Sequence, residues 1–287
     1  MMEQRALGPL PVSVLSLGSW QTYERIPRAD GVAVLDAARD VGITLLEVAR
    51  YNAASPDAPL ATGYSEVVFG EIFRTSGWPR DEVAIANKLW WEFWPEQSVT
   101  QELEASLQRT GLDHFDFIYS DPPPAELAIE EVCEAVGGLV TAGKVKGWGV
   151  VNWPAERIAE ARAVATVPPV AAQLPYNLIF RGMVEAPEMV EAMGPMGVVA
   201  SAVLAGGALT GKYADGGFGR LSGRLDDPRF AAALAEAEQL RERAAELGTT
   251  PAALAIRFAA EAPRVATVLL GATSPEQVRE NARAIAL

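Results

Sequence analysis

Eight short apolar runs, each of strand length, recur along the chain and are separated by stretches with helical periodicity. Several of these runs are continuously apolar or β-branched, which is typical of strands covered on both faces in a parallel sheet. The predicted strands are Ser13–Gly18, Ile43–Val48, Val83–Lys88, Phe115–Ser120, Gly147–Val151, Val170–Leu174, Val198–Ala202 and Ala266–Leu270. Strand–helix alternation repeated this often predicts a parallel (β/α)8 barrel, the TIM barrel.

The predicted helices between the strands begin and end at recognisable signals. One begins on Ser98, has Glu102 close behind as an acid of the capping type, and ends before Gly111. The full set is Asp30–Asp40, Ser98–Thr110, Ile129–Ala142, Pro154–Ala165, Glu185–Met193, Pro228–Leu247, Thr250–Ala262 and Ser274–Ile285. A doubly wound open sheet is the alternative, but it would normally carry a G-x-G-x-x-G turn after its first strand, and none is present there.

Length and composition fit one barrel. The chain has 287 residues and 49% hydrophobic residues, and a TIM barrel uses about 250 residues, so we expect a single domain over residues 1–287. The net charge of −13 argues against nucleic acid or an anionic membrane as a partner. The single cysteine, Cys133, cannot form an internal disulfide, and neither a membrane-spanning run nor a signal pattern is visible. We therefore expect a cytoplasmic protein.

Three predicted strands end on ionisable or amide side chains. In a barrel, chemistry takes place at the carboxyl ends of the strands, so these side chains predict one site there. They are Glu47, Arg50, Tyr51 and Asn52 at and just beyond the end of the second strand, Lys88 at the end of the third, and Asp121 after the fourth. The long segments 52–64 and 214–227 also follow strand ends, and we expect them to form rims or lids over the site.

Six segments, in the same order, resemble the aldo-keto reductase superfamily, including the branch that contains the potassium-channel β subunits. Each segment alone is a weak or moderate signal, but six in the right order are highly specific. They are Leu17–Trp20, Gly63–Gly70, Asn87–Trp90, Gly143–Asn152, Leu204–Tyr213 and Gly271–Asn281.

The resemblance implies a nicotinamide dinucleotide cofactor, NADP(H), bound in an extended pose at the strand ends. Asn152 and Gln173 would hold the carboxamide, Lys212 would supply charge to the pyrophosphate, and Ser274 would stand at a helix N-terminus suited to a phosphate. The implied cofactor-binding residues are Ser19, Trp20, Asn152, Gln173, Ser201, Leu204, Gly206, Lys212, Arg220, Gly271, Thr273, Gln277, Glu280 and Asn281. No metal is expected.

Some cofactor positions depart from the family pattern. Gly271 and Gln277 replace the Lys and Arg that grip the 2′-phosphate in many members, so the preference for NADP over NAD stays open. The remaining candidates for that contact are Arg220, Arg224 and Arg279. Ser201 replaces the aromatic residue that stacks on the nicotinamide in the family.

The catalytic positions depart further from the family's Asp, Tyr, Lys and His. Lys88 matches, but Glu47 replaces the aspartate and Asn52 stands where the tyrosine is expected, with Tyr51 one residue early. The histidine position falls on Asp121. The only histidine, His114, lies seven residues earlier.

These departures leave the proton donor open. Reduction of a carbonyl by hydride needs an acid at the developing alkoxide, and in the family a tyrosine with a pKa lowered by a nearby lysine supplies it. Tyr51 could reach this place through a shifted loop. Alternatively, Glu47 or Asp121 acts as a protonated acid or stabilises a cationic substrate such as an iminium. A third interpretation is an inactive site that senses or holds the cofactor, and a fourth is redox-neutral chemistry.

Four aromatic residues within five positions, 90–94, follow Lys88 directly. They either form an apolar wall for a substrate or fill the barrel rim. The predicted substrate pocket contains Trp20, Tyr51, Trp90 and Trp91. The sequence therefore predicts an NAD(P)H-dependent oxidoreductase that acts on a small hydrophobic carbonyl or imine. The alternatives are a catalytically inactive NADP(H)-binding regulatory protein and a redox-neutral isomerase or dehydratase that retains the cofactor.

Overall fold

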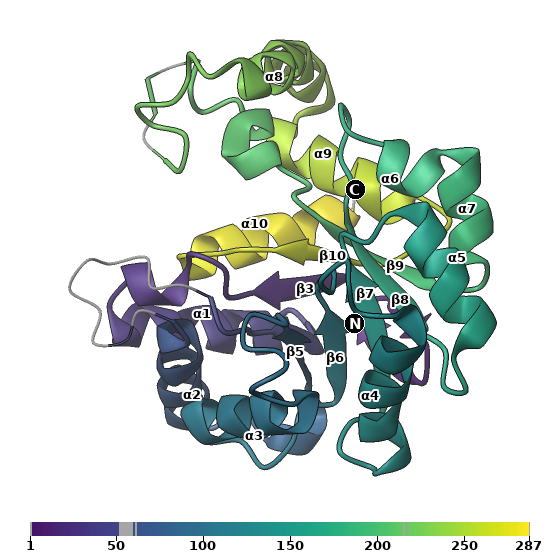
Figure 1. Ribbon diagram of the computed structural model, residues 1–287. Helices are drawn as coiled ribbons and strands as arrows, with labels where there is room; N and C mark the ends of the chain where they lie inside the picture. Colours follow the sequence, from purple (N-terminus) through teal and green to yellow (C-terminus); the bar gives the residue numbers. More distant parts are fainter. Residues whose placement is uncertain (1, 52–59, 61, 215, 218, 287) are drawn as a thin grey trace.

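The computed structural model describes residues 2–51, 60, 62–214, 216–217 and 219–286. Its centre is a closed barrel of parallel strands in the order β10-β3-β4-β5-β6-β7-β8-β9 (Figure 1). The strands are β3 (Leu15–Gly18), β4 (Leu45–Glu47), β5 (Ala84–Leu89), β6 (Phe117–Ser120), β7 (Gly147–Val151), β8 (Ala171–Pro175), β9 (Gly197–Ser201) and β10 (Val265–Leu270). Each predicted strand overlaps one of these, and the predicted (β/α)8 barrel is confirmed.

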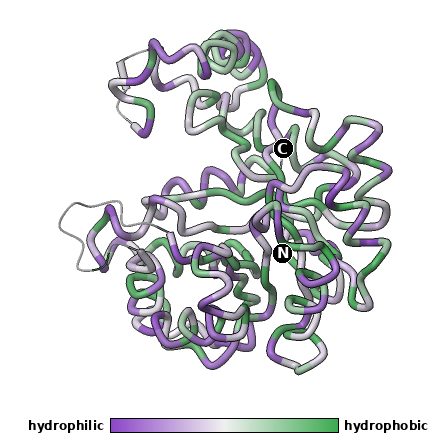
Figure 2. The backbone as a smooth tube through the Cα atoms, in the orientation of Figure 1, coloured by the Kyte–Doolittle hydropathy of each residue, from purple (hydrophilic) through white to green (hydrophobic). Residues whose placement is uncertain are grey.

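Helices cover the outside of the barrel. They are α1 (Arg28–Asp40), α2 (Tyr64–Ser76), α3 (Val99–Thr110), α4 (Ile129–Thr141), α5 (Ala155–Val164), α6 (Gly182–Glu185), α7 (Pro187–Met193), α8 (Pro228–Leu247), α9 (Pro251–Glu261) and α10 (Pro275–Ala286). Short 3-10 turns are η1 (Tyr23–Arg25), η2 (Arg80–Glu82) and η3 (Ala205–Thr210). Helix α8 packs against η3 and α9, outside the main ring. Figure 2 shows hydrophilic and hydrophobic residues interspersed along it.

An N-terminal hairpin, absent from the predicted elements, covers the end of the barrel opposite the carboxyl ends of its strands. Its antiparallel strands are β1 (Gln4–Leu7) and β2 (Leu10–Ser13). Leu7 and Val12 are fully buried and pack in one cluster with Phe117 and Ala171 of the barrel interior. Ser13, which the sequence placed in the first barrel strand, instead ends β2. With this end covered, the barrel is open to a ligand from the carboxyl ends of its strands.

The start of α3 corrects one prediction. The Ser98 hydroxyl accepts a hydrogen bond from the backbone N–H of Gln101, and the Gln101 side chain accepts one from the backbone N–H of Ser98. This capping box uses Gln101, not Glu102. Glu102 is 6% exposed and binds Arg50 and a backbone N–H at the active-site end.

An ion-pair network at the opposite end ties β5 to β6. Asp116 is almost fully buried, and its carboxylate accepts hydrogen bonds from Lys146 Nζ at 2.7 Å, from Ile85 N at 2.9 Å and from Arg80 Nη2 at 2.5 Å. Burial alone would raise the pKa of Asp116, but these donors outweigh it and hold the pKa below its usual value. A carboxyl whose pKa is lower in the folded than in the unfolded chain stabilises the fold once it is ionised.

We expect Asp116→Asn to lower the free energy of unfolding by about 1–3 kcal/mol at pH 7, because a buried acceptor shared by three donors is lost. The contribution is complete above the unfolded carboxyl pKa of about 3.9 and disappears as the pH falls through the lower folded value. Urea unfolding of both proteins at pH 7 and pH 3 measures this. A difference that stays the same at pH 3 would contradict it.

Candidate active site

Three buried side chains meet at the carboxyl ends of β4 and β5. The Tyr51 hydroxyl donates to Glu47 Oε1 at 2.6 Å. The Lys88 ammonium donates to the Tyr51 hydroxyl oxygen at 2.7 Å and to Glu47 Oε1 at 3.1 Å. A fourth residue, Gln173 of β8, donates from Nε2 to Glu47 Oε2 at 2.7 Å. We call these four residues the Glu47 cluster.

A tight turn after β4 delivers Tyr51 to this position. The backbone N–H of Tyr51 donates to Ala49 O at 2.8 Å, an i to i−2 bond that contracts the chain over three residues. Ser65, at the start of α2, donates to the same carbonyl at 2.7 Å and accepts from Tyr51 N at 3.3 Å. The Tyr51 hydroxyl therefore reaches Lys88, although Tyr51 precedes the expected tyrosine position by one residue. Asn52, at that position, lies outside the described residues.

Glu47 serves as an acceptor in this arrangement. Lys88 is a donor only, and the Gln173 contact is made through its amide nitrogen, so both carboxylate oxygens receive hydrogen bonds from cationic or neutral donors. Tyr51 adds a third. A side chain held in this way orients Lys88 and Tyr51. The contact between Glu47 and Lys88 is also a salt bridge.

Tyr51 is protonated at neutral pH. Burial, followed by the charge of Glu47 and its hydrogen bond, raises the pKa of Tyr51 well above its usual value of 10.0. The resemblance implied the opposite direction, a tyrosine with a pKa lowered by the lysine. The difference arises because burial and, after it, the charge of the Glu47 carboxylate both disfavour a phenolate at this position. Tyr51 therefore carries a proton that it can donate.

Asp121 stands at the end of β6, close enough to Lys88 to feel its charge. Burial raises the pKa of Asp121 to about 6, against the pull of the Lys88 ammonium. No hydrogen bond reaches its carboxylate from the described part of the chain. His114 is elsewhere: its side chain is 47% exposed and lies 3.9 Å from Asp116, at the opposite end of the barrel.

The aromatic segment divides between two roles. The Trp90 ring meets the Tyr51 ring edge-on, with centroids 5.6 Å apart, and it stays partly exposed. Trp91 is 5% exposed, and its indole N–H donates to Ser120 Oγ at 2.9 Å and to Asp121 O at 3.1 Å. Trp91 therefore fastens the loop to β6 and offers almost no surface to a substrate, unlike the predicted role. Trp20 is 50% exposed.

The mouth of the barrel has unused polar atoms that fit a nicotinamide cofactor. Gln173 Oε1 and Ser19 Oγ are both buried, and neither has a hydrogen-bond partner. A carboxamide, which both donates and accepts, suits such atoms. Asn152 follows β7 with a positive φ of 57°, and its backbone N–H donates to Gln173 O at 3.1 Å. The donor and acceptor set thus fits the group that the sequence implied.

Two further sets of contacts involve residues that the resemblance implied for the rest of the dinucleotide. The Arg220 guanidinium lies 4.9 Å from the centroid of the Trp20 ring, which joins the loops after β3 and β9. At the start of α10, Gln277 Oε1 accepts from Thr273 N at 2.9 Å, and Gln277 N donates to Ser274 Oγ at 3.3 Å. The other predicted residues end β9, follow β9 or β10, or lie on α10: Ser201, Leu204, Gly206, Lys212, Gly271, Glu280 and Asn281.

Comparison with known proteins settles the family. The family model of the Aldo/keto reductase family matches residues 14–287. The chain belongs to the aldo/keto reductase family. Members of this family are typically NAD(P)H-dependent oxidoreductases. The chain of this aldo/keto reductase is also similar to proteins named as voltage-gated potassium channel β subunits.

Three such relatives cover nearly the whole chain. A probable β subunit from Oryza sativa is 31% identical, over 99% of this chain and 91% of that protein. One from Arabidopsis thaliana is 30% identical, over 99% and 91%. A protein of Schizosaccharomyces pombe that bears the same subunit name is 32% identical, over 96% and 85%. The resemblance to this branch of the aldo/keto reductases is confirmed.

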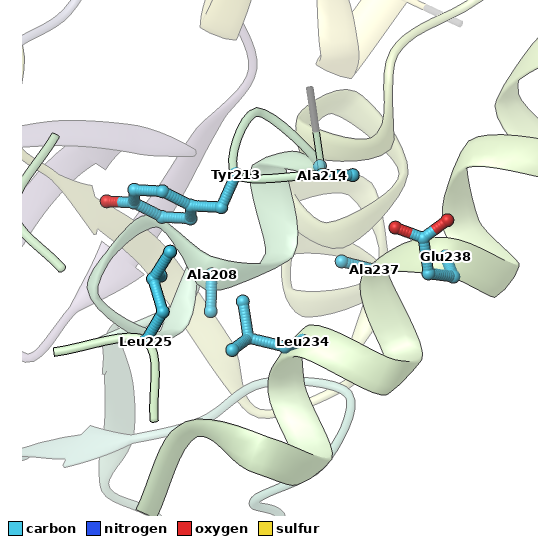
Figure 3. Close-up of a pocket in the computed structure, with 8 residues that line it drawn as sticks. Ala208, Tyr213, Ala214, Leu225, Leu234, Ala237 and Glu238 are labelled. Carbon is cyan, nitrogen blue, oxygen red and sulfur yellow. The ribbon is translucent and has the colours of Figure 1, made fainter. Parts of the chain in front are cut away.

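A hollow of this aldo/keto reductase lies between η3 and α8, away from the Glu47 cluster. Its volume is about 200 Å³, and Figure 3 shows the Glu238 carboxylate on the side away from Tyr213. The lining residues are Ala208, Gly211, Tyr213, Ala214, Leu225, Leu234, Ala237 and Glu238. None belongs to the Glu47 cluster. Across the described residues, no group of three or more His, Cys, Asp or Glu could hold a metal ion, and none of the helices is long and apolar enough to cross a membrane.

Ser65 and Tyr119 were not singled out from the sequence, and Arg50 was placed at the site without a specific role. Ser65 holds the turn that positions Tyr51, and Arg50 anchors the same turn. Tyr119 lies inside the barrel beside Glu47 with an unpaired hydroxyl, and burial followed by the Glu47 charge raises its pKa well above 10.0. The period-two alternation of β6 could have indicated that Tyr119, like Phe117, faces inward. The roles of Ser65 and Arg50 depend on contacts with distant helices.

Proposed function

We propose that this protein is an NADP(H)-dependent oxidoreductase that reduces a small hydrophobic carbonyl or imine, with Tyr51 as the proton donor to a carbonyl oxygen. One observation carries the proposal: the Tyr51 hydroxyl lies within hydrogen-bond distance of both Lys88 and Glu47. A protonated phenol beside a buried ammonium can give its proton to a substrate oxygen, because the ammonium stabilises the phenolate that forms.

Each residue of the site has its own role in the proposed reaction. The cofactor, when bound, supplies the hydride to the substrate carbon. Tyr51 gives its proton to the substrate oxygen, and the Lys88 ammonium at 2.7 Å stabilises the phenolate that remains until solvent returns a proton. Glu47 keeps Lys88 in place. Gln173, Asn152 and Ser19 would hold the carboxamide end of the cofactor, and Trp20 and Trp90 would form the apolar wall against the substrate.

The first test is NADPH oxidation with a panel of aldehydes, ketones and cyclic imines, beside a titration of cofactor followed by tryptophan fluorescence. Turnover of at least one class supports the proposal. Fluorescence quenching without turnover of any substrate would overturn it and leave a protein that only binds the cofactor. Product formation without net consumption of NADPH would indicate a redox-neutral isomerase or dehydratase. We further propose one barrel domain over residues 1–287 and, from the single buried cysteine, a cytoplasmic location.

A regulatory, cofactor-binding role is the second candidate. The names of the relatives, which describe channel subunits, favour it, as does Ser201 in place of the stacking aromatic residue. In that case cofactor occupancy itself would be the signal. The Tyr51–Lys88 contact favours the enzyme, because a site that only holds cofactor does not need a proton donor beside a buried ammonium.

We expect Asp121 to make binding of a cationic substrate depend on pH. With a pKa of about 6, its carboxyl is neutral below pH 6 and charged above it. The KM for an N-methylated cyclic iminium, whose charge is fixed, should therefore fall about fivefold as the pH rises from 5 to 7, the effect of a partly exposed ion pair worth ~1 kcal/mol. Steady-state kinetics of Asp121→Asn should show a flat KM. A neutral ketone is the control, and an equal pH effect on its KM would refute the assignment.

A further inference from the structure

Arg50 is a buried cation with partners on two elements. It is 4% exposed. Nη2 donates to Glu102 Oε1 of α3 at 3.0 Å, and Nη1 donates to Glu92 Oε2 at 2.6 Å. The guanidinium also lies 4.7 Å from the centroid of the Phe93 ring. Arg50 thus ties the chain directly before Tyr51 to α3 and to the aromatic loop.

Glu102 completes the connection from the other side. Its Oε1, which binds Arg50, also accepts from the backbone N–H of Trp90 at 3.1 Å. The Trp90 ring in turn packs edge-on against Tyr51. One carboxylate oxygen therefore holds both the backbone neighbour of Tyr51 and the ring that packs on it. Tyr51 is fixed from two directions through a single ion pair.

Stability alone does not explain this pair. The side chains of Arg50 and Glu102 are 2% and 8% exposed. An ion pair this deeply buried is often no more stabilising than well-packed apolar residues of similar volume, because both charges lose their hydration. What the pair adds over apolar residues is direction: the planar guanidinium binds Glu102 through Nη2 and Glu92 through Nη1, and two contacts from one rigid plane fix an orientation.

We propose that the Arg50–Glu102 ion pair is a positioning device that sets the Tyr51 hydroxyl against Lys88. It holds the contracted turn after β4, so that a tyrosine one residue early occupies the donor position. Its kinetic consequence rests on the proposed function, in which Tyr51 is the acid. Its geometric consequence, a fixed Tyr51 ring, does not.

The geometric consequence is tested without turnover. In protein labelled with 13C at tyrosine Cζ, the Tyr51 signal is assigned as the one that Tyr51→Phe removes. Arg50→Lys keeps the charge but not the two-nitrogen contact, and Glu102→Gln keeps the size but not the charge. Both are expected to shift or broaden the Tyr51 signal. Arg80→Lys, which alters a cation bound to the buried Asp116 at the other end of the barrel, should leave it unchanged. A Tyr51 signal unaltered in both pair variants overturns the proposal.

The kinetic consequence separates positioning from general damage. With a ketone substrate, Arg50→Lys should lower kcat by about 10²-fold, the effect of displacing a reacting group by about 1 Å, with the NADPH Kd unchanged. The same change in a Tyr51→Phe background should have no further effect. An equal loss with the N-methylated iminium, whose reduction needs no proton, would overturn the proposal. If the unaltered protein reduces nothing, the proposed function fails and the NMR comparison decides the positioning role by itself.

Discussion

Tyr51→Phe is expected to lower kcat for a ketone by about 10²–10⁴-fold, because the substrate oxygen loses its general acid. The Kd for NADPH should stay near that of the unaltered protein, since the phenyl ring keeps its packing on Trp90. The contact between Glu47 and Lys88 also remains in this variant. Steady-state rates of NADPH oxidation and a fluorescence titration measure the two quantities on the same preparation.

An iminium substrate supplies the control within one active site. Hydride addition to a carbonyl carbon leaves an alkoxide that needs a proton, whereas addition to an N-methylated iminium gives a neutral amine directly. Tyr51→Phe should therefore reduce the iminium at close to the unaltered rate while it nearly fails on the ketone. Equal retention of both activities would show that Tyr51 is not the donor and would move that role to Asp121. Equal loss of both would mean that the variant is damaged as a whole.

The fold was predictable because its signals are local and repeated. Continuous apolar runs and proline-led helix starts each lie within one element, and their order determines the barrel. The hairpin was not predicted because Leu10–Gly18 forms a nearly continuous apolar run in the sequence. The structure divides it, with Ser13 ending β2 and Leu15 beginning β3. The division depends on strand pairing, because β2 pairs with β1 whereas β3 pairs with β4 and β10. The sequence pattern does not show which strands pair.

The site was predictable only in part. Lys88, Glu47 and Gln173 came from position in the family pattern, and the structure brings them together. The sequence did not decide whether the Tyr51 hydroxyl reaches Lys88. An alignment gives only the number of residues after the strand, whereas the turn held by Ser65, fourteen positions later in the chain, determines where the Tyr51 side chain lies. The direction of the Tyr51 pKa depends on burial and on the nearness of the Glu47 charge. Neither quantity can be obtained from residue types alone.

Lys88→Met is expected to lower the free energy of unfolding markedly. It removes the cation that balances Glu47, whose side chain is 3% exposed. Breaking a buried pair at one partner typically costs about 3–5 kcal/mol, because the other charge stays buried without compensation. Urea unfolding measures the loss. Lys144→Met is the matched control, since the Lys144–Glu104 pair is 39% and 55% exposed, and its loss should stay below about 1 kcal/mol.

Adding Glu47→Gln to Lys88→Met separates stability from chemistry. Without the buried carboxylate, the remaining amide can keep hydrogen bonds to Tyr51 and Gln173, and much of the lost stability should return. Ketone reduction should not return, because no ammonium remains to stabilise the Tyr51 phenolate. A single Lys88→Met variant as stable as the double variant would contradict the attribution of the lost stability to a buried Glu47 side chain without its cation. Recovery of activity together with stability would exclude Lys88 from the reaction and leave it a purely structural counter-ion of Glu47.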